Sequence, residues 1–375
     1  MKIGLIIYGR LDTLSGGYLY DRKLVEHLEG AGDEVEIISL PWEGYGRSLL
    51  HNFWFALAEQ LRQAEFDLLL QDELNHPSLF WLNRRLRGQV SYPIVSIVHH
   101  LRCSERRPRW QNWLYQQVER RYLAAVDGFI FNSQTTRQVV QSLVGEVQPH
   151  VVAFPAGDRF QATITPPQIE ERARQPGPLR LLFVGNLIPR KGLHVLLEAV
   201  AGLPESDWQL DLVGDTAVSL RYTQQIRQQI TRQGLDSSVT LHGPLHGNEL
   251  ATQMAHSHLL VVPSSYEGFG IVYLEGMAFG LPAIAGRGGA AHEIISEGVN
   301  GFLVEGAAAL RQHLHMLHHN RAQLAQMSHA AQTRFAAHPT WTESMTKTRE
   351  FLQSVIPAQV GIQVGHKNGY PPSRV

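Results

Sequence analysis

Short apolar segments alternate with amphipathic segments along most of this chain, and this alternation constrains the fold more than any other feature. In the first half, the apolar segments predict strands at residues 2–8, 34–40, 66–71, 93–98 and 127–132. Helical spacing of apolar residues predicts helices at residues 16–30, 50–64, 78–87, 109–125 and 134–144. Because a helix follows each strand, the strands can pair in parallel, with helices on both faces of the sheet.

The same alternation starts again at Leu179. It predicts strands at residues 179–185, 208–213, 238–242, 258–263 and 282–285, which complete a second sheet. The helices predicted between them cover residues 191–201, 219–233, 246–255 and 270–279. The predicted fold class is therefore α/β, with two doubly wound Rossmann-like domains. Such domains bind ligands at the carboxyl ends of their strands, which we expect to face each other across a cleft.

The composition along the chain suggests where the domains begin and end. We assign residues 1–155 to the first domain and residues 179–338 to the second. Residues 156–178 are rich in proline and charged side chains, and we interpret them as a linker. We expect residues 339–356 to form a helix that crosses back to the first domain. Residues 357–375 are rich in glycine and proline and are expected to be a disordered tail.

The composition also excludes several classes of protein. A formal net charge of −1 over 375 residues argues against bulk electrostatic attraction to nucleic acid. The single cysteine, Cys103, allows no disulfide within the chain and fits a reducing compartment. The opening residues lack a signal-peptide cleavage pattern, and no stretch has the roughly 18 uninterrupted apolar residues of a membrane span. We expect a cytoplasmic protein, at most attached peripherally to the inner face of a membrane.

Residues 261–293 place two glutamates on either side of a glycine-containing helix start. Glu267 precedes the sequence Gly268-Phe269-Gly270, and Glu275 lies inside the helix that follows. Such a helix start offers free backbone N–H groups and the positive end of the helix dipole to an anion. The carboxylates can accept hydrogen bonds from sugar hydroxyls. A capped helix with two solvated glutamates is the alternative interpretation.

A second candidate site joins the predicted strand 179–185 to the next helix. Asn186, Arg190 and Lys191 lie in this connection. The helix dipole disfavours two cations at a helix N-terminus unless an anion shares the site. A diphosphate fits that requirement, whereas the alternative is that both basic residues are merely exposed.

Two candidates in the first half lie at the corresponding edge of the other sheet. Gly16 and Gly17 open the first helix, where they would let the backbone approach a phosphate, although many such pairs form only a turn. His99 follows the predicted strand 93–98, so it is expected to point into the cleft and bind a sugar hydroxyl. A core or surface histidine is the alternative. The G-x-G-x-x-G fingerprint is missing after the first strand, which counts against a nicotinamide cofactor.

Together these residues resemble glycosyltransferase family 4, group 1, whose members are retaining enzymes of the GT-B fold. Two glutamates separated by seven residues, at Glu267 and Glu275, and the pair Gly288-Gly289 after them carry much of the resemblance. The similar segments are residues 185–192, 213–215, 263–264, 267–289 and 300–304 in the second half and, more loosely, residues 16–17, 98–99 and 132–133 in the first. The resemblance spans about residues 2–355.

The resemblance implies a role for each candidate in the second half. Arg190 and Lys191 would hold the donor diphosphate, and Glu275 would bind the ribose hydroxyls of the nucleotide. Glu267 would contact the transferred sugar. The amides of the sequence Gly268-Phe269-Gly270 would help to position that sugar.

The resemblance also implies roles in the first half. His99 would contact the donor sugar near the reacting carbon, and Gly17 would approach the phosphate. The sequence departs from the family at His100, on the acceptor side of the site, where many members carry an acidic residue.

We expect neither a metal nor a cofactor besides the donor substrate. The chain contains no Asp-x-Asp pair, so Arg190 and Lys191 are left to neutralise the diphosphate. The histidines at positions 313, 315, 318 and 319 fall on a predicted helix without cysteine, aspartate or glutamate at ligand spacing, so we interpret them as surface residues.

The predicted function is transfer of a hexose-type sugar, with retention, from a nucleotide diphosphate sugar to a hydroxyl of a carbohydrate or lipid-linked acceptor. Synthesis of a polysaccharide, a glycolipid or another glycoconjugate is the expected context. A nucleotide-sugar 2-epimerase and a non-catalytic binding subunit of the same fold are the alternatives.

The segment 102–121 is a candidate for contact with a membrane. It carries six arginines against two glutamates, and Trp110 and Trp113 lie among them. Such a face could rest on anionic lipid. A solvated basic face with its apolar side in the core is the alternative.

Overall fold

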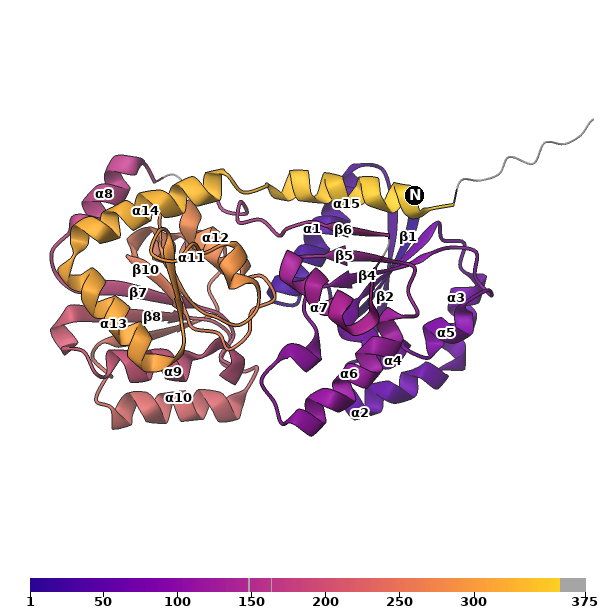
Figure 1. The fold of residues 1–375 in the computed structure, drawn as a ribbon, viewed down its shortest axis with the longest axis horizontal. Helices are drawn as coiled ribbons and strands as arrows, with labels where there is room; N and C mark the ends of the chain where they lie inside the picture. Colours follow the sequence, from indigo (N-terminus) through magenta and orange to yellow (C-terminus); the bar gives the residue numbers. More distant parts are fainter. Residues whose placement is uncertain (148, 163, 358–375) are drawn as a thin grey trace, which may run out of the picture.

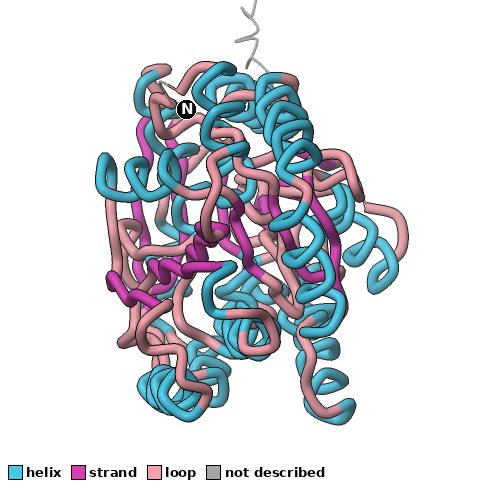
Figure 2. The backbone as a smooth tube through the Cα atoms, turned by 90° about the vertical axis from the view of Figure 1, so that its left-hand side faces the viewer, coloured by secondary structure: helices cyan, strands magenta, loops and turns pink. Residues whose placement is uncertain are grey.

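The computed structural model describes residues 1–147, 149–162 and 164–357, and the tail expected beyond Pro357 lies outside this range. Two α/β lobes lie side by side, the N-terminal one in indigo and magenta and the C-terminal one in rose and orange (Figure 1). A 90° turn shows the strands in the interior with helices around them (Figure 2). Each lobe contains one parallel six-stranded sheet, which confirms the predicted fold class.

The N-terminal sheet has the order β2-β1-β3-β4-β5-β6. Its strands are β1 (Lys2–Tyr8), β2 (Glu34–Leu40), β3 (Leu68–Asp72), β4 (Ile94–Val98), β5 (Gly128–Phe131) and β6 (His150–Val152). The central strands β3 and β4 are buried along their whole length, because helices cover both faces of the sheet.

Seven α-helices belong to the described part of this lobe. They are α1 (Gly16–Gly30), α2 (Tyr45–Ser48), α3 (Phe55–Gln63), α4 (His76–Leu79), α5 (Leu82–Leu86), α6 (Arg109–Leu123) and α7 (Gln134–Val144). The short 3-10 helices are η1 (Leu49–Phe53), η2 (Glu73–Asn75) and η3 (Arg102–Ser104). Helix α1 begins where the Ser15 side chain accepts the N–H of Tyr18, a typical N-terminal cap.

The C-terminal sheet has the order β12-β11-β10-β7-β8-β9. Its strands are β7 (Leu179–Val184), β8 (Trp208–Val213), β9 (Val239–Gly243), β10 (Leu259–Val262), β11 (Ala283–Gly286) and β12 (Gly301–Val304). Its α-helices are α8 (Pro166–Arg174), α9 (Leu193–Val200), α10 (Leu220–Arg232), α11 (Gly247–His256), α12 (Ile271–Ala278), α13 (Gly306–His319) and α14 (Arg321–Ala336). Its 3-10 helices are η4 (Pro189–Lys191), η5 (Glu205–Asp207) and η6 (Ala290–Glu293).

Several details differ from the sequence predictions. The edge strands β6 and β12 were not predicted. Strand β6 has only three residues, and the short 3-10 helix η6 rather than an α-helix precedes β12, so the strand–helix alternation does not reveal it. The predicted linker contains α8, which contacts α14 and whose Arg172 donates to the carbonyls of Ala255 and Phe279. The single helix predicted at 50–64 is divided into η1 and α3 at Trp54, whose backbone is extended.

Helix α15 (Trp341–Val355) connects the two lobes. It continues the direction of α14 and lies along the N-terminal lobe, where it contacts α1 and β6 (Figure 1). Thr340 and Glu343 form a capping box at its start. Near its other end, Arg349 forms an ion pair with Asp33 at 2.7 Å, and the terminal amine of Met1 contacts the same carboxylate.

The strand order determines where ligands can bind. In a doubly wound sheet the binding crevice lies at the carboxyl ends of the two strands where the winding direction reverses. Those strands are β1 and β3 in the N-terminal sheet and β7 and β10 in the C-terminal sheet. The loops after these four strands therefore form the two sides of one cleft.

Candidate active site

A cleft of about 1350 Å³ lies between the two lobes, and residues after β1, β3, β4, β7 and β10 line it. All the sequence-predicted site residues are found in its lining: Gly16, Gly17, His99, Asn186, Arg190, Lys191, Glu267, Gly268, Phe269, Gly270 and Glu275. The structure thus brings together residues that are up to about 260 positions apart, because they lie in the connections that follow the carboxyl ends of the strands or in the helices that begin there.

Lys191 and Glu267 form the central ion pair on the C-terminal side of the cleft. The Nζ atom of Lys191 lies 2.8 Å from Oε2 of Glu267. The Ser264 hydroxyl donates to the same oxygen at 3.0 Å. Lys191 comes from η4 after β7, and Glu267 comes from the loop after β10. The pair therefore joins the connections that follow the two strands where the winding direction of the sheet reverses.

The surroundings of this pair shift the pKa values of both groups downward. Burial raises the pKa of Glu267, but the charges of Lys191 and Arg190 and the two hydrogen bonds outweigh burial and lower that pKa to about 2. Burial and the charge of Arg190 lower the pKa of Lys191, against the opposing effect of Glu267. Two basic side chains, Arg190 and Lys191, therefore lie beside the buried Glu267 carboxylate in the cleft, where they can meet an anion.

The backbone of η4 is held directly against the loop after β10. The carbonyl of Arg190 accepts the N–H of Ser265 at 2.8 Å, and the Arg190 guanidinium donates to the carbonyl of Tyr266 at 2.8 Å. Gly192, with φ of 73°, follows η4, and a Cβ atom there would lie 2.1 Å from the carbonyl oxygen of Pro263. Only glycine allows the backbone at position 192 to lie this close to Pro263. This close packing places Arg190 and Lys191 beside Glu267.

The sequence Gly268-Phe269-Gly270 brings the C-terminal lobe against the N-terminal lobe. A Cβ atom on Gly268 would lie 2.5 Å from the carbonyl oxygen of His99. The Ser133 hydroxyl donates to the carbonyl of Gly268 at 3.2 Å. Gly270 has a φ of 98° and precedes α12, as the sequence predicted for a glycine-containing helix start. This loop is therefore in contact with the N-terminal lobe next to His99.

Glu275 lies inside α12 with only 2% of its surface exposed. Its carboxylate forms a two-pronged ion pair with the guanidinium of Arg159, whose Nη2 atom lies 3.0 Å from Oε2. Burial raises the pKa of Glu275, and Arg159 opposes this effect. Arg159 thus orients a buried carboxylate at the edge of the cleft, where hydroxyl groups of a ligand could reach it.

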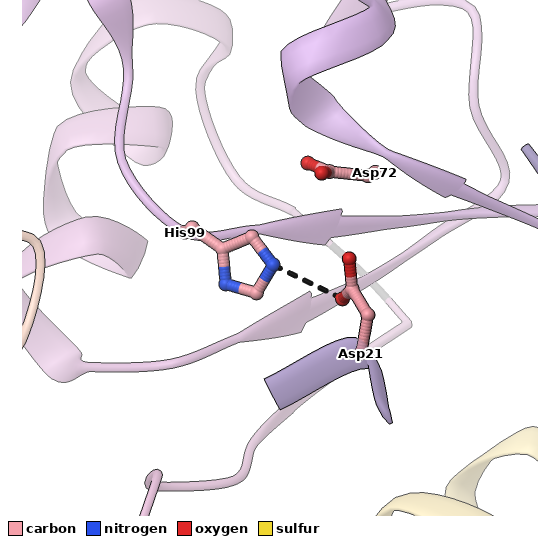
Figure 3. Close-up of side chains that lie close together, drawn as sticks. All are labelled: Asp21, Asp72 and His99. Atoms are coloured by element: carbon pink, nitrogen blue, oxygen red, sulfur yellow. Dashed lines mark hydrogen bonds and ion pairs between the residues drawn. The ribbon is translucent and has the colours of Figure 1, made fainter. Parts of the chain in front are cut away.

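His99 directly follows β4 and is held by residues from α1 (Figure 3). Its Nε2 atom lies 3.1 Å from Oδ1 of Asp21, which is fully buried. A Cβ atom on Gly17 would lie 3.1 Å from Cδ2 of the imidazole, so the missing side chain makes room for the ring. The ring packs edge-on against Tyr20 at 5.4 Å.

Asp21, Asp72 and His99 converge from α1, β3 and β4 (Figure 3). Burial lowers the pKa of His99, but Asp21, Asp72 and Glu73 outweigh burial and raise that pKa to about 9. Burial and the charge of Asp21 raise the pKa of Asp72 to about 7. Near neutral pH the cluster therefore contains an imidazolium that is paired with Asp21.

Contacts across the cleft also involve Asn186. Its side-chain amide donates to the carbonyl of Leu14 at 3.2 Å, in the loop before Gly16. Gly16 faces α12, since a Cβ atom there would lie 3.6 Å from Ile271. These contacts place the amino end of α1 opposite the loop that carries Arg190 and Lys191.

Two groups of acidic and histidine side chains have the spacing of a cation site. One consists of Asp21, Asp72 and His99, and the other of Glu73, His76 and Glu119, each with its ligand atoms within 4.8 Å of one another. In the first group, Nε2 of His99 is already bound to Asp21. In the second, His76 contacts Glu73 at 3.0 Å and Tyr45 at 3.1 Å. Both arrangements are consistent with hydrogen-bonded clusters within the lobe.

Sequence reasoning missed Asp21, Asp72 and Arg159. Asp21 lies four residues after Gly17 and thus on the same face of α1, a spacing that could have identified it. Asp72 is the last residue of β3. His99 was selected because a residue at the carboxyl end of a parallel strand is expected to point into the cleft, and the same reasoning applies to Asp72. Arg159 lies in the predicted linker, and nothing local to its sequence indicates that it pairs with Glu275.

Large apolar side chains are exposed on the N-terminal lobe near the basic segment 102–121. Trp110, Trp113 and Leu114 on α6 are exposed by 66%, 58% and 46%. Exposed aromatic side chains also occur at Trp42, Phe53, Trp54, Phe55 and Trp81. Within the part of the chain that the structure describes, no helix is both long enough and apolar enough to cross a bilayer.

Two protein-family models match the chain. The model of the group 1 glycosyl transferases matches residues 165–334, and the model of glycosyltransferase family 4 matches residues 20–157. Each match covers most of one lobe, and together they include nearly all the candidate residues.

Curated relatives carry glycosyltransferase names. A D-inositol 3-phosphate glycosyltransferase of Arthrobacter sp. (strain FB24) is 31% identical over 234 residues, which cover 58% of this chain and 54% of the relative. A protein of the same name from Geodermatophilus obscurus is 30% identical over 308 residues, which cover 72% of this chain and 66% of the relative. The chain thus spans about half to two thirds of the length of these relatives.

Solved structures share the fold over nearly the whole chain. Sucrose-phosphate synthase from Thermosynechococcus elongatus has a TM-score of 0.80 at 22% identity, covering 94% of this chain and 98% of that chain. Anabaena HepE in complex with UDP and glucose has a TM-score of 0.75 at 22% identity, covering 94% and 100%. The family models, the named relatives and the shared two-lobed fold agree, and this chain belongs to the group 1 glycosyltransferases of glycosyltransferase family 4.

Proposed function

We propose that the protein transfers a hexose-type sugar, with retention, from a nucleotide diphosphate sugar to a hydroxyl acceptor. One observation carries this proposal. Arg190, Lys191 and Glu267 meet on one side of the cleft, and His99 lies on the other side, beside Gly268. Cations for a diphosphate and hydrogen-bonding groups for a sugar are thus within one cavity.

The charges in the cleft suit the cleavage of an anomeric bond. Departure of the nucleoside diphosphate places negative charge on its phosphate oxygens and positive charge on the sugar ring. Arg190 and Lys191 would stabilise the leaving group, and each preorganised donor contributes about 3 kcal/mol at such sites. The Glu267 carboxylate lies close enough to Lys191 to hold the ammonium in place.

Retention places the acceptor on the same side of the sugar as the leaving group. The acceptor hydroxyl would attack from that side, and its proton would pass to the departing phosphate. In this scheme the chain supplies orientation and charge, so Glu267 and Glu275 bind hydroxyl groups rather than move the proton. Closure of the two lobes over the donor would exclude water and limit hydrolysis.

The identity of the donor rests on similarity to other proteins. HepE has been solved in complex with UDP and with UDP-glucose, and its fold matches this chain. In this chain, Glu275 would bind the ribose hydroxyls, and the backbone near Gly17 would approach the diphosphate. We propose that the reaction needs no metal, because Arg190 and Lys191 can neutralise the leaving group.

A carbohydrate or lipid-linked acceptor is proposed for the N-terminal side of the cleft, in the synthesis of a polysaccharide, a glycolipid or another glycoconjugate. The exposed Trp110 and Trp113 lie in the arginine-rich segment 102–121, and this combination suits the surface of an anionic membrane. Flotation with vesicles of phosphatidylcholine alone or with anionic phosphatidylglycerol tests the contact. Binding that requires the anionic lipid and decreases in Trp110→Ser/Trp113→Ser supports it, whereas no binding to either vesicle contradicts it.

A thermal-shift screen of nucleotide diphosphate sugars tests the donor assignment. A ligand at 100 times its dissociation constant stabilises a protein by about 2.7 kcal/mol, so the correct donor will raise the Tm. The donors that bind are then incubated with and without candidate hydroxyl acceptors, with and without a metal chelator. Transfer that persists with chelator supports the full proposal.

The same incubations separate the alternatives. An epimerised sugar formed from the donor alone would identify a nucleotide-sugar 2-epimerase. Donor binding without turnover over a broad acceptor panel would identify a non-catalytic binding subunit.

A further inference from the structure

Asp21 is a buried carboxylate whose side chain hydrogen-bonds to His99. Its side chain has no solvent exposure, and Oδ1 accepts from Nε2 of His99 at 3.1 Å. The other oxygen, Oδ2, is fully buried and has no hydrogen-bond partner among the described residues. A buried carboxylate with an unpaired oxygen destabilises a fold, so its presence calls for a role in the site.

The other atoms around His99 leave the ring little freedom. Gly17 and Tyr20 of α1 contact its edge, and the Asn132 amide donates to its backbone carbonyl at 2.8 Å. The Nδ1 atom makes no hydrogen bond to any residue that the structure describes, and the ring lines the cleft. One ring nitrogen is therefore held by the protein, and the other is available to a ligand.

The charge of the imidazole ring determines whether Nδ1 donates or accepts a hydrogen bond. With Nε2–H donating to a carboxylate, a neutral imidazole has an acceptor at Nδ1, whereas an imidazolium has a donor there. The charged groups that face His99 are Asp21 from α1, Asp72 from β3 and Glu73 from η2, and the C-terminal lobe presents the backbone of Gly268. All three side chains are acidic and favour the imidazolium when they are ionised. Burial raises the pKa of Glu73 to about 8, so Asp21, which contacts the ring directly, has the largest effect near neutral pH.

We propose that Asp21 is a positioning residue that holds His99 as an imidazolium, so that Nδ1–H donates a hydrogen bond to an oxygen of the donor sugar. This inference rests on the proposed function. The ion pair of Asp21 and His99 is neutral as a whole, so it orients the sugar without adding net charge beside the positive charge that develops on the ring. The unpaired Oδ2 is the cost of burying this carboxylate next to the ring.

Nuclear magnetic resonance of the imidazoles tests the pairing without any substrate. In protein labelled with ¹⁵N-histidine, the His99 signals are assigned by their loss in His99→Gln. We expect His99 to titrate near pH 9 in the wild-type protein and at a clearly lower pH in Asp21→Asn, because the paired carboxylate is lost while burial still disfavours the imidazolium. Titration near pH 6.5 in the wild-type protein would overturn the proposal, even if Asp21→Asn failed to fold.

Kinetics of the donor reaction test the positioning role. We expect Asp21→Asn to lower kcat by about 10²-fold, with the donor KM changed only a few-fold. Because Asp21 acts through His99, Asp21→Asn should add almost nothing in the His99→Gln background, whereas a merely structural carboxylate would add its full effect. Glu26→Gln, which removes an exposed carboxylate from the same helix, is the matched control and should retain activity.

The two arms separate this inference from the proposed function. If no transfer is found with any donor, the titration still decides whether Asp21 holds His99 as an imidazolium. If transfer occurs but Asp21→Asn leaves kcat unchanged, the positioning role is wrong and the transferase function stands.

Discussion

Glu293 of the C-terminal lobe caps the helix that contains Thr135 in the N-terminal lobe. Its carboxylate accepts the backbone N–H of Thr135 at 2.7 Å and the hydroxyl of the same residue at 2.5 Å. The N–H of Gln134 donates to its other oxygen at 3.0 Å. The free N–H groups and the dipole at the start of α7 favour a carboxylate at this position. The two lobes are thus held together beside the cleft by a helix cap supplied from the opposite lobe.

Glu293→Ala should therefore loosen the closed arrangement of the lobes. A helix cap contributes about 0.5–2 kcal/mol, enough to shift an equilibrium between open and closed lobes several-fold. We expect a larger radius of gyration by small-angle X-ray scattering and weaker donor binding. Glu36→Ala, at an exposed position of β2, is the control and should change neither quantity. An unchanged radius of gyration in Glu293→Ala would mean that other contacts suffice to close the cleft.

Gly192→Ala and Gly234→Ala distinguish backbone strain from a steric clash. Both glycines have similar φ values, 73° and 69°, but a Cβ atom on Gly234 meets nothing within 4 Å, whereas one on Gly192 meets Pro263. We expect Gly234→Ala to lower the free energy of unfolding by about 1–2 kcal/mol through its left-handed backbone alone. Gly192→Ala should cost more than that and also reduce activity, because Arg190 and Lys191 must move. Equal urea midpoints for the two variants would contradict this explanation.

Lys191→Ala and Glu275→Gln should affect different kinetic constants. Lys191 is proposed to stabilise the charge of the leaving group, so Lys191→Ala should lower kcat by about 10²–10³-fold. Glu275 is proposed to bind the ribose in the ground state and the transition state alike, so Glu275→Gln should mainly raise the donor KM. The assay is release of the nucleoside diphosphate over a range of donor concentrations. Lys23→Ala on α1 is the control, and near-normal turnover in Lys191→Ala would refute the site assignment.

The pH dependence of stability should reveal the ionised Glu267. Its folded-state pKa of about 2 lies below the ordinary value of 4.5, so the folded protein favours the carboxylate. The stability that Glu267 contributes is therefore fully present above about pH 4.5 and is lost as the pH falls towards 2. Relative to Glu267→Gln, the wild-type protein should lose on the order of 3 kcal/mol over this range. Parallel curves of unfolding free energy against pH for the two proteins would show that Glu267 is not held as predicted.

The sequence indicated most of the fold because its signals are local. Strand and helix periodicity, and glycines at helix starts, depend on neighbouring residues, so β1, α1 and the glycine-containing start of α12 could be predicted. The edge strand β6 was missed because only three residues form it, and β12 was missed because the short 3-10 helix η6, and no α-helix, separates it from β11. Helix α8 was missed because a proline-rich, polar segment reads as a linker until its packing against α14 is known.

The candidate site was predicted as a set of positions but not as a set of contacts. His99, Arg190 and Glu267 each follow a strand, and parallel strands bring their carboxyl ends to one edge, so the sequence alone determined that these residues face the cleft. It could not determine the pairing of Lys191 with Glu267, or of Arg159 with Glu275. These contacts depend on the relative placement of loops 76 and 116 residues apart.

Tertiary structure also decided the ionisation of the site. Burial penalises every charge, so whether a group is ionised depends on the partner that folding brings to it. Asp21 next to His99, and Glu293 at the start of α7, acquire their roles only when separate elements meet. The amino-acid sequence by itself determined two parallel sheets and the residues at their edges. Only the packing of separate elements, within each lobe and between the lobes, determined which of those residues act together.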